Sequence, residues 1–347
     1  MLKLDEGTFT QSFKTPEELL DATAFLRFLQ AMPSIEVLEL LAEQRLFDIE
    51  VMRHIFTRPG LQALHISPFV LDMELLDEIN PPGGILQNLR SLQLAGHEKP
   101  LSLILSRMSH IQAVDLILIC TPFQGPGFTS FTTFLESLSR CPELEEISIT
   151  FNNDDVGTVL DKTMSNSALL SLVTNCPFIR ALRINTTLQA SMTDDLIETM
   201  ASRLVHLEAF SLKTPRFRGL SYKAIASFAR HCPSLHELYL PIRVELPKLE
   251  DEPDDVRFPK LQLLHVARAT FLPAEMAEDC NSVHETLIRL LDSRFPRLII
   301  FGNLPGFSSH ARQMQVSIAN YLRKRFSRSS PRVKLVWKAI KQSILKD

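Results

Sequence analysis

One pattern, apolar-x-x-apolar-x-apolar, recurs along the chain, and a proline stands shortly before many of its copies. The first copy begins at Ile35, and successive copies begin 22 to 37 residues apart, with a mean of about 29. Later copies begin at Leu61, Leu89, Ile111, Leu144, Ile179, Leu207, Leu235, Leu261 and, in degenerate form, Leu298. Apolar residues that alternate over so short a stretch predict a β-strand with one buried face. Their regular order predicts a repeat protein.

The segments between these strands are predicted to be helices. Apolar residues at helical spacing precede several prolines, as in Phe134–Cys141, Leu169–Cys176 and Ile225–Cys232. Proline disfavours the helical conformation in the residue before it, so each helix ends there and the chain turns into a strand. The cysteines before these prolines are interpreted as small core residues. Neither a lone helix nor a lone strand can bury its apolar face, so neighbouring units must stack.

A strand–helix unit of this length that carries L-x-x-L-x-L resembles the leucine-rich repeat, over residues 16–310. The resemblance is to the long, irregular repeats of the ribonuclease-inhibitor-like superfamily. The polar residue expected after the last leucine is present only as Asn152, so no continuous asparagine ladder is expected. The resemblance implies an α/β solenoid of nine to ten repeats, curved, with a parallel sheet inside and helices outside. Residues 16–31 are expected to form a leading helix, with Leu19, Ala22, Leu26 and Leu29 inward.

Variable repeat length with Cys-Pro or Phe-Pro before the strand is most similar to the repeats of F-box proteins, particularly the large families of fungi. In that family an F-box docks the adaptor of a cullin–RING ubiquitin ligase, and the repeats choose the substrate. Thr15–Leu20 superficially resembles the start of an F-box, but the first repeat strand follows too soon at Ile35. Two alternatives remain: the repeat region of a ligase substrate receptor, or a stand-alone inhibitor or scaffold. The adaptor is an expected partner only if an F-box lies upstream.

Charge divides the chain unevenly. Residues 321–347 hold nine basic side chains and one acidic one, a net charge of +8, whereas residues 1–320 have a net charge of −11. An acidic body is a poor partner for phosphate backbones, so a nucleic-acid partner is not expected. We divide the chain into a solenoid, 1–310, and a basic C-terminal cap helix and tail, 311–347. A nuclear-localisation or phosphate-binding role is the alternative for the tail.

The composition is typical of a soluble globular protein, with 45% hydrophobic residues, 22% charged residues and a mean hydropathy of +0.05. No stretch is long and apolar enough to span a membrane, and the first residues lack the pattern of a signal peptide. Five cysteines without a C-x-x-C pair fit a reducing compartment. The expected location is therefore the cytoplasm or the nucleus.

Motifs for catalysis and cofactor binding are incomplete. His284-Glu285 begins a zinc-protease motif, but Ile288 stands where the second histidine is required. The segment 152–155 lacks the ligand spacing of a calcium loop and is read as a polar loop. The acidic segment 247–258 interrupts the repeat as a solvated loop or a binding loop. We expect no enzymatic activity, no metal and no cofactor.

The outward strand positions are the candidate binding site. Side chains alternate along a strand, so the second and fifth positions of the motif face away from the core. Their mixed chemistry favours a protein partner on the concave face, although any solvated sheet needs polar residues there. The candidate contact residues are Asp115, Arg180, Arg183, His236, Tyr239 and His265. Tyrosine and arginine dominate binding hot spots, so Tyr239 is the first residue to test.

Overall fold

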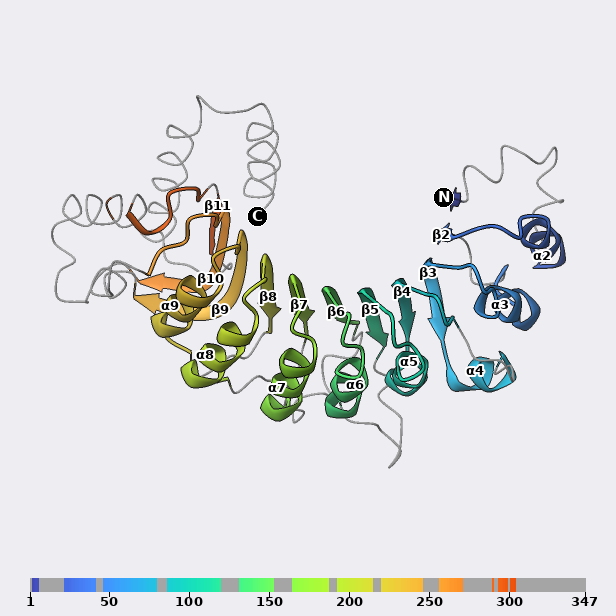
Figure 1. Ribbon diagram of the computed structural model, residues 1–347, viewed down its shortest axis with the longest axis horizontal. Helices are drawn as coiled ribbons and strands as arrows, with labels where there is room; N and C mark the ends of the chain where they lie inside the picture. The colour runs from blue at the N-terminus through green and yellow to red at the C-terminus, as the bar shows by residue number, and fades with distance from the viewer. Residues whose placement is uncertain are drawn as a thin grey trace, which may run out of the picture. The chain divides into compact units, whose positions relative to one another are not determined.

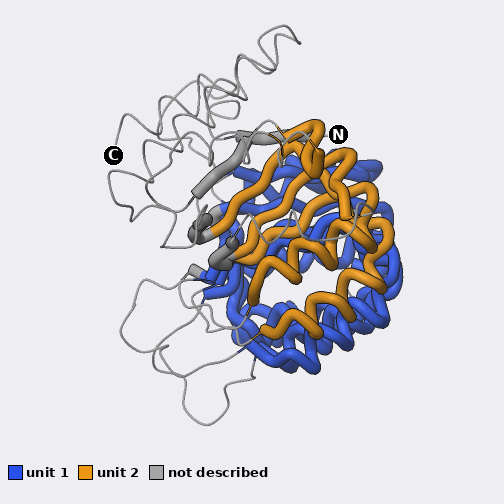
Figure 2. Tube along the Cα trace, turned by 90° about the vertical axis from the view of Figure 1, so that its left-hand side faces the viewer, with its two compact units in different colours: residues 1–191, 214–216 blue, residues 192–213, 217–347 orange. Residues whose placement is uncertain are grey.

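The computed structural model describes residues 2–5, 22–41, 46–79, 86–119, 131–152, 164–186, 192–214, 220–245, 256–270, 289, 293–298 and 300–303. Its residues form two compact units, one of 1–191 with 214–216 and one of 192–213 with 217–347 (Figure 2). The expected division at residue 310 and the basic tail lie outside the described residues, as does most of the acidic segment 247–258.

Strands and helices alternate through the first unit and as far as β9 in the second (Figure 1). The strands of the first unit are β1 (Leu2–Asp5), β2 (Val37–Leu41), β3 (Ala63–Leu71), β4 (Ser91–Gly96), β5 (Ala113–Ile119), β6 (Glu146–Asn152) and β7 (Ala181–Asn185). Its helices are α2 (Ala22–Gln30), α3 (Ile49–Phe56), α4 (Met73–Ile79), α5 (Glu98–Leu105), α6 (Phe131–Leu138) and α7 (Asn166–Asn175). The second unit contains α8 (Asp194–Arg203), β8 (Ala209–Lys213), α9 (Tyr222–His231), β9 (Glu237–Glu245), β10 (Leu263–Thr270) and β11 (Ile300–Asn303).

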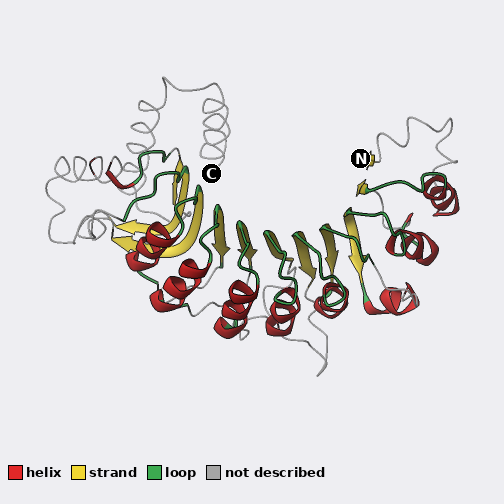
Figure 3. Cartoon of the chain, in the orientation of Figure 1, coloured by secondary structure: helices red, strands yellow, loops and turns green. Residues whose placement is uncertain are grey.

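Every strand pair among the described residues is parallel, and within each unit the strands follow chain order. The helices lie on one side of the sheet in each unit, and the strands form the other side (Figure 3). A parallel sheet built from stacked strand–helix units confirms the predicted leucine-rich-repeat solenoid. Among the described helices, none is long and apolar enough to cross a membrane.

The repeat motif forms the core. In all eight copies from Leu61 to the one that begins at Leu261, the three apolar residues of the motif are buried. In the first copy Leu38 and Leu40 are buried, whereas Ile35 is only half-buried. Burying a leucine or isoleucine side chain contributes about 1.5–3 kcal/mol, so the repeated motif supplies the main stabilisation of the sheet.

The motif predicts strands from its second position, near 36–40, 62–66 and the equivalent residues of later copies, and each observed strand begins one residue later, as β2 does at Val37. The strand β1 was not expected, and it pairs with β2 so that Leu2 lies beside Leu38. Within the described residues the leading helix is α2, which buries Phe25 and Leu29, whereas the expected inward residues Ala22 and Leu26 are only half-buried and Leu19 lies outside the described residues. The ring of Phe25 makes an edge contact with that of Phe47, 6.4 Å away, which turns this face of α2 toward the core.

The cysteines before the prolines are buried as expected, and they connect successive repeats. The Cys141 thiol donates to the Met108 carbonyl (3.2 Å), and the Cys176 thiol donates to the Cys141 carbonyl (3.2 Å). The Cys232 thiol donates to the Leu204 carbonyl (3.4 Å). Burial raises the thiol pKa to about 11 for Cys141 and about 12 for Cys232. For Cys176, burial and then the neighbouring Cys141 raise the pKa to about 12.

Arg58 occupies the matching place before Pro59, and it is a buried charged residue among these apolar ones. Its Nη2 donates to the Leu29 carbonyl (2.5 Å) and lies 2.9 Å from Nε2 of His54. Its Nη1 atom is buried and has no hydrogen-bond partner. Burial lowers the pKa of Arg58. The guanidinium thus ties α3 to the carboxyl end of α2 without full hydrogen bonding.

Candidate partner-binding surface

The fifth motif positions form continuous rows of side chains, as the alternation predicts. Neighbouring strands place the members of each row side by side in register. In the first unit the row is Glu39, His65, Gln93, Asp115, Ser148 and Arg183, and in the second unit it is Ser211, Tyr239 and His265. The predicted inward and outward faces of the strands are therefore confirmed.

The second motif positions form a backbone ladder beside these rows. The carbonyl of Glu145, for example, accepts hydrogen bonds from the backbone amides of both Arg180 (2.7 Å) and Ala181 (3.0 Å). The carbonyls of Glu208 and His236 accept in the same way from the next repeat in the second unit. This ladder fixes where each strand begins, and it leaves the side chains of the second positions on the surface.

Three of the six candidate residues lie in the first unit. The guanidinium of Arg180 lies 3.8 Å from the carboxylate of Glu145, an exposed ion pair between adjacent second positions. Asp115 and Arg183 are half-buried and stand in the fifth-position row, with Ser148 between them. With strands about 4.8 Å apart, Asp115 and Arg183 are about 10 Å apart along the row. They form a polar surface of mixed charge.

The other three candidates lie in the second unit, where the structure brings two of them together. The rings of Tyr239 and His265 are stacked, with centroids 5.3 Å apart and planes 27° apart. The ammonium group of Lys213 lies 5.1 Å from the centre of the Tyr239 ring. His236 is half-buried and lies in the second-position row, at the amino end of the strand. Lys213, Tyr239 and His265 form one cluster across β8, β9 and β10, which we name the Tyr239 stack.

Sequence reasoning missed Lys213. The residue follows the last apolar position of its motif and ends β8, so the strand alternation carries it to the same face as the fifth position. The second and fifth positions of the motif do not include this residue. The seventh position would have revealed a lysine one strand away from the tyrosine.

The Tyr239 stack has a defined charge at neutral pH. Burial raises the pKa of Tyr239, so its hydroxyl stays protonated and can donate a hydrogen bond. Burial, and then the positive charge of Lys213, lower the pKa of His265, while Glu237 acts in the opposite direction. His265 is therefore neutral at pH 7, and Lys213 supplies the positive charge of the stack.

Ser211 differs from the expectation of an open, solvated row, because it is only 5% exposed. Its register neighbour is Tyr239, and Lys213 follows two residues later in the same strand. A hydroxymethyl group is too short to reach past two such long side chains. Ser211 therefore lies beneath the stack and is not itself a contact residue.

The helical side of the second unit has its own polar cluster. Glu198 on α8 lies 2.6 Å from Nε2 of His231 on α9, and Arg230 lies 3.9 Å from the same carboxylate. Hydrogen bonds from Ser227 and then from His231 lower the pKa of Glu198. These contacts join two neighbouring helices, so the cluster is structural.

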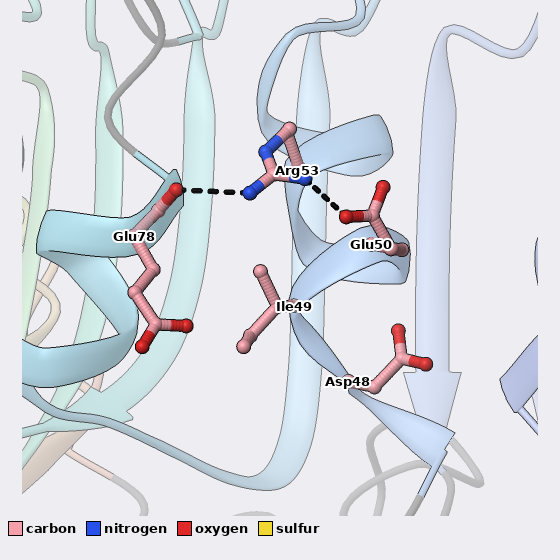
Figure 4. A pocket seen from close by; sticks show the side chains of 5 residues that line it. All are labelled: Asp48, Ile49, Glu50, Arg53 and Glu78. Carbon is pink, nitrogen blue, oxygen red and sulfur yellow. Dashed lines mark hydrogen bonds and ion pairs between the residues drawn. The ribbon is translucent and has the colours of Figure 1, made fainter.

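A pocket of about 500 Å³ lies between α3 and α4 in the first unit, lined by Asp48, Ile49, Glu50, Arg53 and Glu78 (Figure 4). Arg53 interacts with the Glu50 carboxylate and donates to the Glu78 carbonyl (3.1 Å). Asp48 caps α3 by accepting from the Val51 amide (2.8 Å). The polar groups of this pocket already serve the helices. Within the described part of the chain, no group of three His, Cys, Asp or Glu residues could hold a metal ion.

The geometry defines a leucine-rich-repeat fold whose outward strand faces carry polar side chains. No protein-family model matches the chain, and no curated protein sequence does. The solved structures that are similar to this chain include the following two. One is a chain from the crystal structure of the Rad7 and Elc1 complex in yeast, with a TM-score of 0.41 and 13% identity over 81% of this chain. The other is the leucine-rich repeat-containing protein LegL7 from Legionella pneumophila, with a TM-score of 0.33 and 16% identity.

The coverage of the two similar chains differs. This chain spans 63% of the length of the matched yeast chain, and the LegL7 match covers 80% of this chain and 94% of that one. With TM-scores below 0.5, both similarities are remote. The fold assignment therefore rests on the repeat geometry of this chain.

Proposed function

We propose that the chain is a protein-recognition module that binds a partner on the outward faces of its strands. The observation that carries this proposal is the Tyr239 stack, an ordered and partly exposed cluster on the sheet face of the second unit. Tyrosine is enriched at binding hot spots because it offers a large, rigid surface with one polar end. Stacking against His265 holds the ring in one position before a partner arrives, which reduces the entropy lost on binding.

Mixed charge along the rows supports a protein partner. Asp115, Arg183 and Glu39 alternate with neutral polar residues in the first unit. A nucleic-acid surface requires a continuous run of basic side chains, and these rows interrupt each positive charge with neutral or acidic residues. Electrostatic complementarity of this mixed kind gives specificity for one protein over another.

The finer proposal is that the partner is a substrate of an SCF-type ubiquitin ligase and that this chain is the substrate-receptor part of an F-box protein. It rests on the resemblance of the repeats, with their variable length and Cys-Pro turns, to those of F-box proteins. A cytoplasmic or nuclear location accompanies this role. In a stand-alone scaffold or inhibitor, the same surface binds its partner without the ligase adaptor.

The test is affinity purification from the source cells with wild type, Tyr239→Ala and Arg230→Gln. Arg230 is the matched control, because it lies on α9 in the same unit but on the helical side. We expect Tyr239→Ala to lose specific partners about tenfold or more and Arg230→Gln to keep them. Equal recovery with all three proteins would contradict the proposed surface. Co-purification of a cullin–RING adaptor with the full-length gene product supports the ligase role, and its absence favours the stand-alone role.

A further inference from the structure

The junction between α2 and α3 in the first unit contains a buried charge that the partner-binding surface does not use. Arg58 follows α3, and only 7% of its surface is exposed. Its Nη2 donates to the carbonyl of Leu29 in the last turn of α2 (2.5 Å), and that oxygen also accepts from the amide of Met32 (3.1 Å). The same Nη2 lies 2.9 Å from Nε2 of His54 on α3. One guanidinium group therefore joins the two helices through two acceptors.

The contact between Arg58 and His54 fixes the protonation state of the histidine. A guanidinium group has five N–H donors and no acceptor, and it keeps its positive charge in proteins. Nε2 of His54 must therefore be the acceptor, so it carries no proton. In the protonated ring the same nitrogen is an N–H donor, and it would bring a second positive charge within hydrogen-bond distance of the first. The observed junction therefore requires a neutral His54.

The other charged groups near this junction do not change that conclusion. The further charged residues on α2, α3 and α4 are Arg27, Glu50, Arg53, Glu74, Asp77 and Glu78. Arg53 pairs with Glu50 on the side of α3 that faces α4. Among the described residues, Arg58 is the charged group that acts on His54. Burial, and then Arg58, lower the pKa of His54, whereas a hydrogen bond from the ring to the Leu29 carbonyl raises that pKa.

We infer that this junction is a pH-sensitive switch, in which protonation of His54 exchanges the donor at the Leu29 carbonyl. In the neutral state Arg58 donates to that oxygen. In the protonated state the His54 ring donates to it, and repulsion between the two cations moves the guanidinium into water. The neighbouring residues 57, 59 and 60 are exposed, so water is close. Nη1 of Arg58 is buried and has no hydrogen-bond partner among the described residues, and water satisfies this group once it moves.

The switch acts on the packing of α2 against α3. The buried residues of α2 are Phe25 and Leu29, and Phe25 makes an edge contact with Phe47, just before α3. A helix of nine residues is not stable by itself in water, so it depends on such packing. Because the junction lowers the pKa of His54, its stabilising effect is complete above the ordinary histidine pKa of about 6.5 and decreases as the pH falls below that value. Acidification therefore loosens α2 and exposes its apolar face.

The first experiment is amide hydrogen exchange of the full chain at pH 7.5 and pH 5.5, expressed as protection factors to remove the intrinsic pH dependence of exchange. We expect the protection of α2 to fall severalfold at pH 5.5. The limit is about tenfold, because one histidine with an ordinary pKa of about 6.5 provides no more over this range. The helix α7 is the internal reference, since it lies in the same unit and contains no charged residue. Its protection should change less than about twofold.

His54→Gln is the decisive variant, because a glutamine side-chain carbonyl accepts from Arg58 at either pH and does not titrate. We expect this variant to lose the pH dependence of α2 protection. His110→Gln is the matched control, since His110 is an exposed histidine of the same unit that lies 2.9 Å from the Glu143 carboxylate. It should keep the pH dependence. Equal pH dependence in wild type and His54→Gln, or unchanged protection of α2 in wild type, would overturn the inference.

A second measurement, an NMR titration of the His54 ring in wild type and in Arg58→Met, does not depend on the folding of a His54 variant. We expect the pKa of His54 to lie below about 6.5 in wild type, and to rise in Arg58→Met because the neighbouring cation is gone. A wild-type pKa at or above the ordinary value contradicts the switch. An unchanged pKa in Arg58→Met contradicts it too, because the two side chains then do not meet in solution.

Discussion

Two adjacent residues of β9 differ chiefly in the face of the sheet that they occupy, which permits a sharp test of the register. Leu238 is fully buried, whereas Tyr239 is half-buried on the outward face. Leu238→Ala removes a branched side chain from a packed core and leaves a cavity, at a cost of about 2–5 kcal/mol in the free energy of unfolding. Tyr239→Ala leaves no internal cavity, so the free energy of unfolding that it costs depends only on the contacts that Tyr239 makes within the stack.

The cost of Tyr239→Ala follows from its two contacts. The ring pair with His265, at 5.3 Å, contributes about 0.5–1.5 kcal/mol. The cation–π contact with Lys213, at 5.1 Å, contributes about 0.5–1 kcal/mol at an exposed site. We therefore expect a loss of about 1–2.5 kcal/mol, above the roughly 0.5 kcal/mol typical of an ordinary surface substitution. Tyr239→Phe keeps both contacts and should stay within about 0.5 kcal/mol of wild type.

The assay is urea denaturation followed by circular dichroism, with amide hydrogen exchange of peptides from β9. Amide hydrogen exchange is needed because repeat proteins can open locally. It shows whether the loss of stability is in the strand that carries the substitution. If Tyr239→Ala destabilises more than Leu238→Ala, the register of β9 is wrong by one residue, since a slip of one exchanges the two faces. If Tyr239→Ala matches Tyr239→Phe, the stack does not form in solution.

Three further outcomes follow from buried or paired groups. The Cys176 and Cys232 thiols, with pKa values of about 12, should resist maleimide at pH 8 until urea unfolds the chain, as peptide mass spectrometry can show. Arg58→Met should leave the melting temperature equal or raised, because a buried charge with an unpaired N–H is replaced by an apolar group of similar length; a large decrease contradicts this. The lowered pKa of Glu198 contributes stability that is present above the ordinary glutamate pKa and is lost as the pH falls through the lowered value. Glu198→Gln, which also weakens the contact with His231, should therefore lose less stability on acidification than wild type, and equal slopes would refute the pairing.

Much of the candidate site could be predicted from the motif. The fifth-position row contains Tyr239 and His265 side by side, as the alternation of the strands predicts. The contact with Lys213 could not be predicted in the same way, because it depends on how far β8 extends and on the direction of a long, flexible side chain. Ser211 shows the same limit, since its burial results from its neighbours and not from its own position in the motif.

The sequence by itself determined the repeat, the parallel pairing in chain order and the two faces of each strand. These follow from a local rule, because burial of the apolar residues at the first, fourth and sixth positions of the motif lowers the free energy of every repeat. The tertiary structure decided what each repeat contacts in the next one. The thiol of Cys176 reaches the carbonyl of Cys141, Arg58 reaches that of Leu29, and Lys213 reaches the ring of Tyr239. Each of these contacts joins residues 26 to 35 positions apart. The distance between the two residues is fixed only when loops of unequal length bring successive repeats into packing contact.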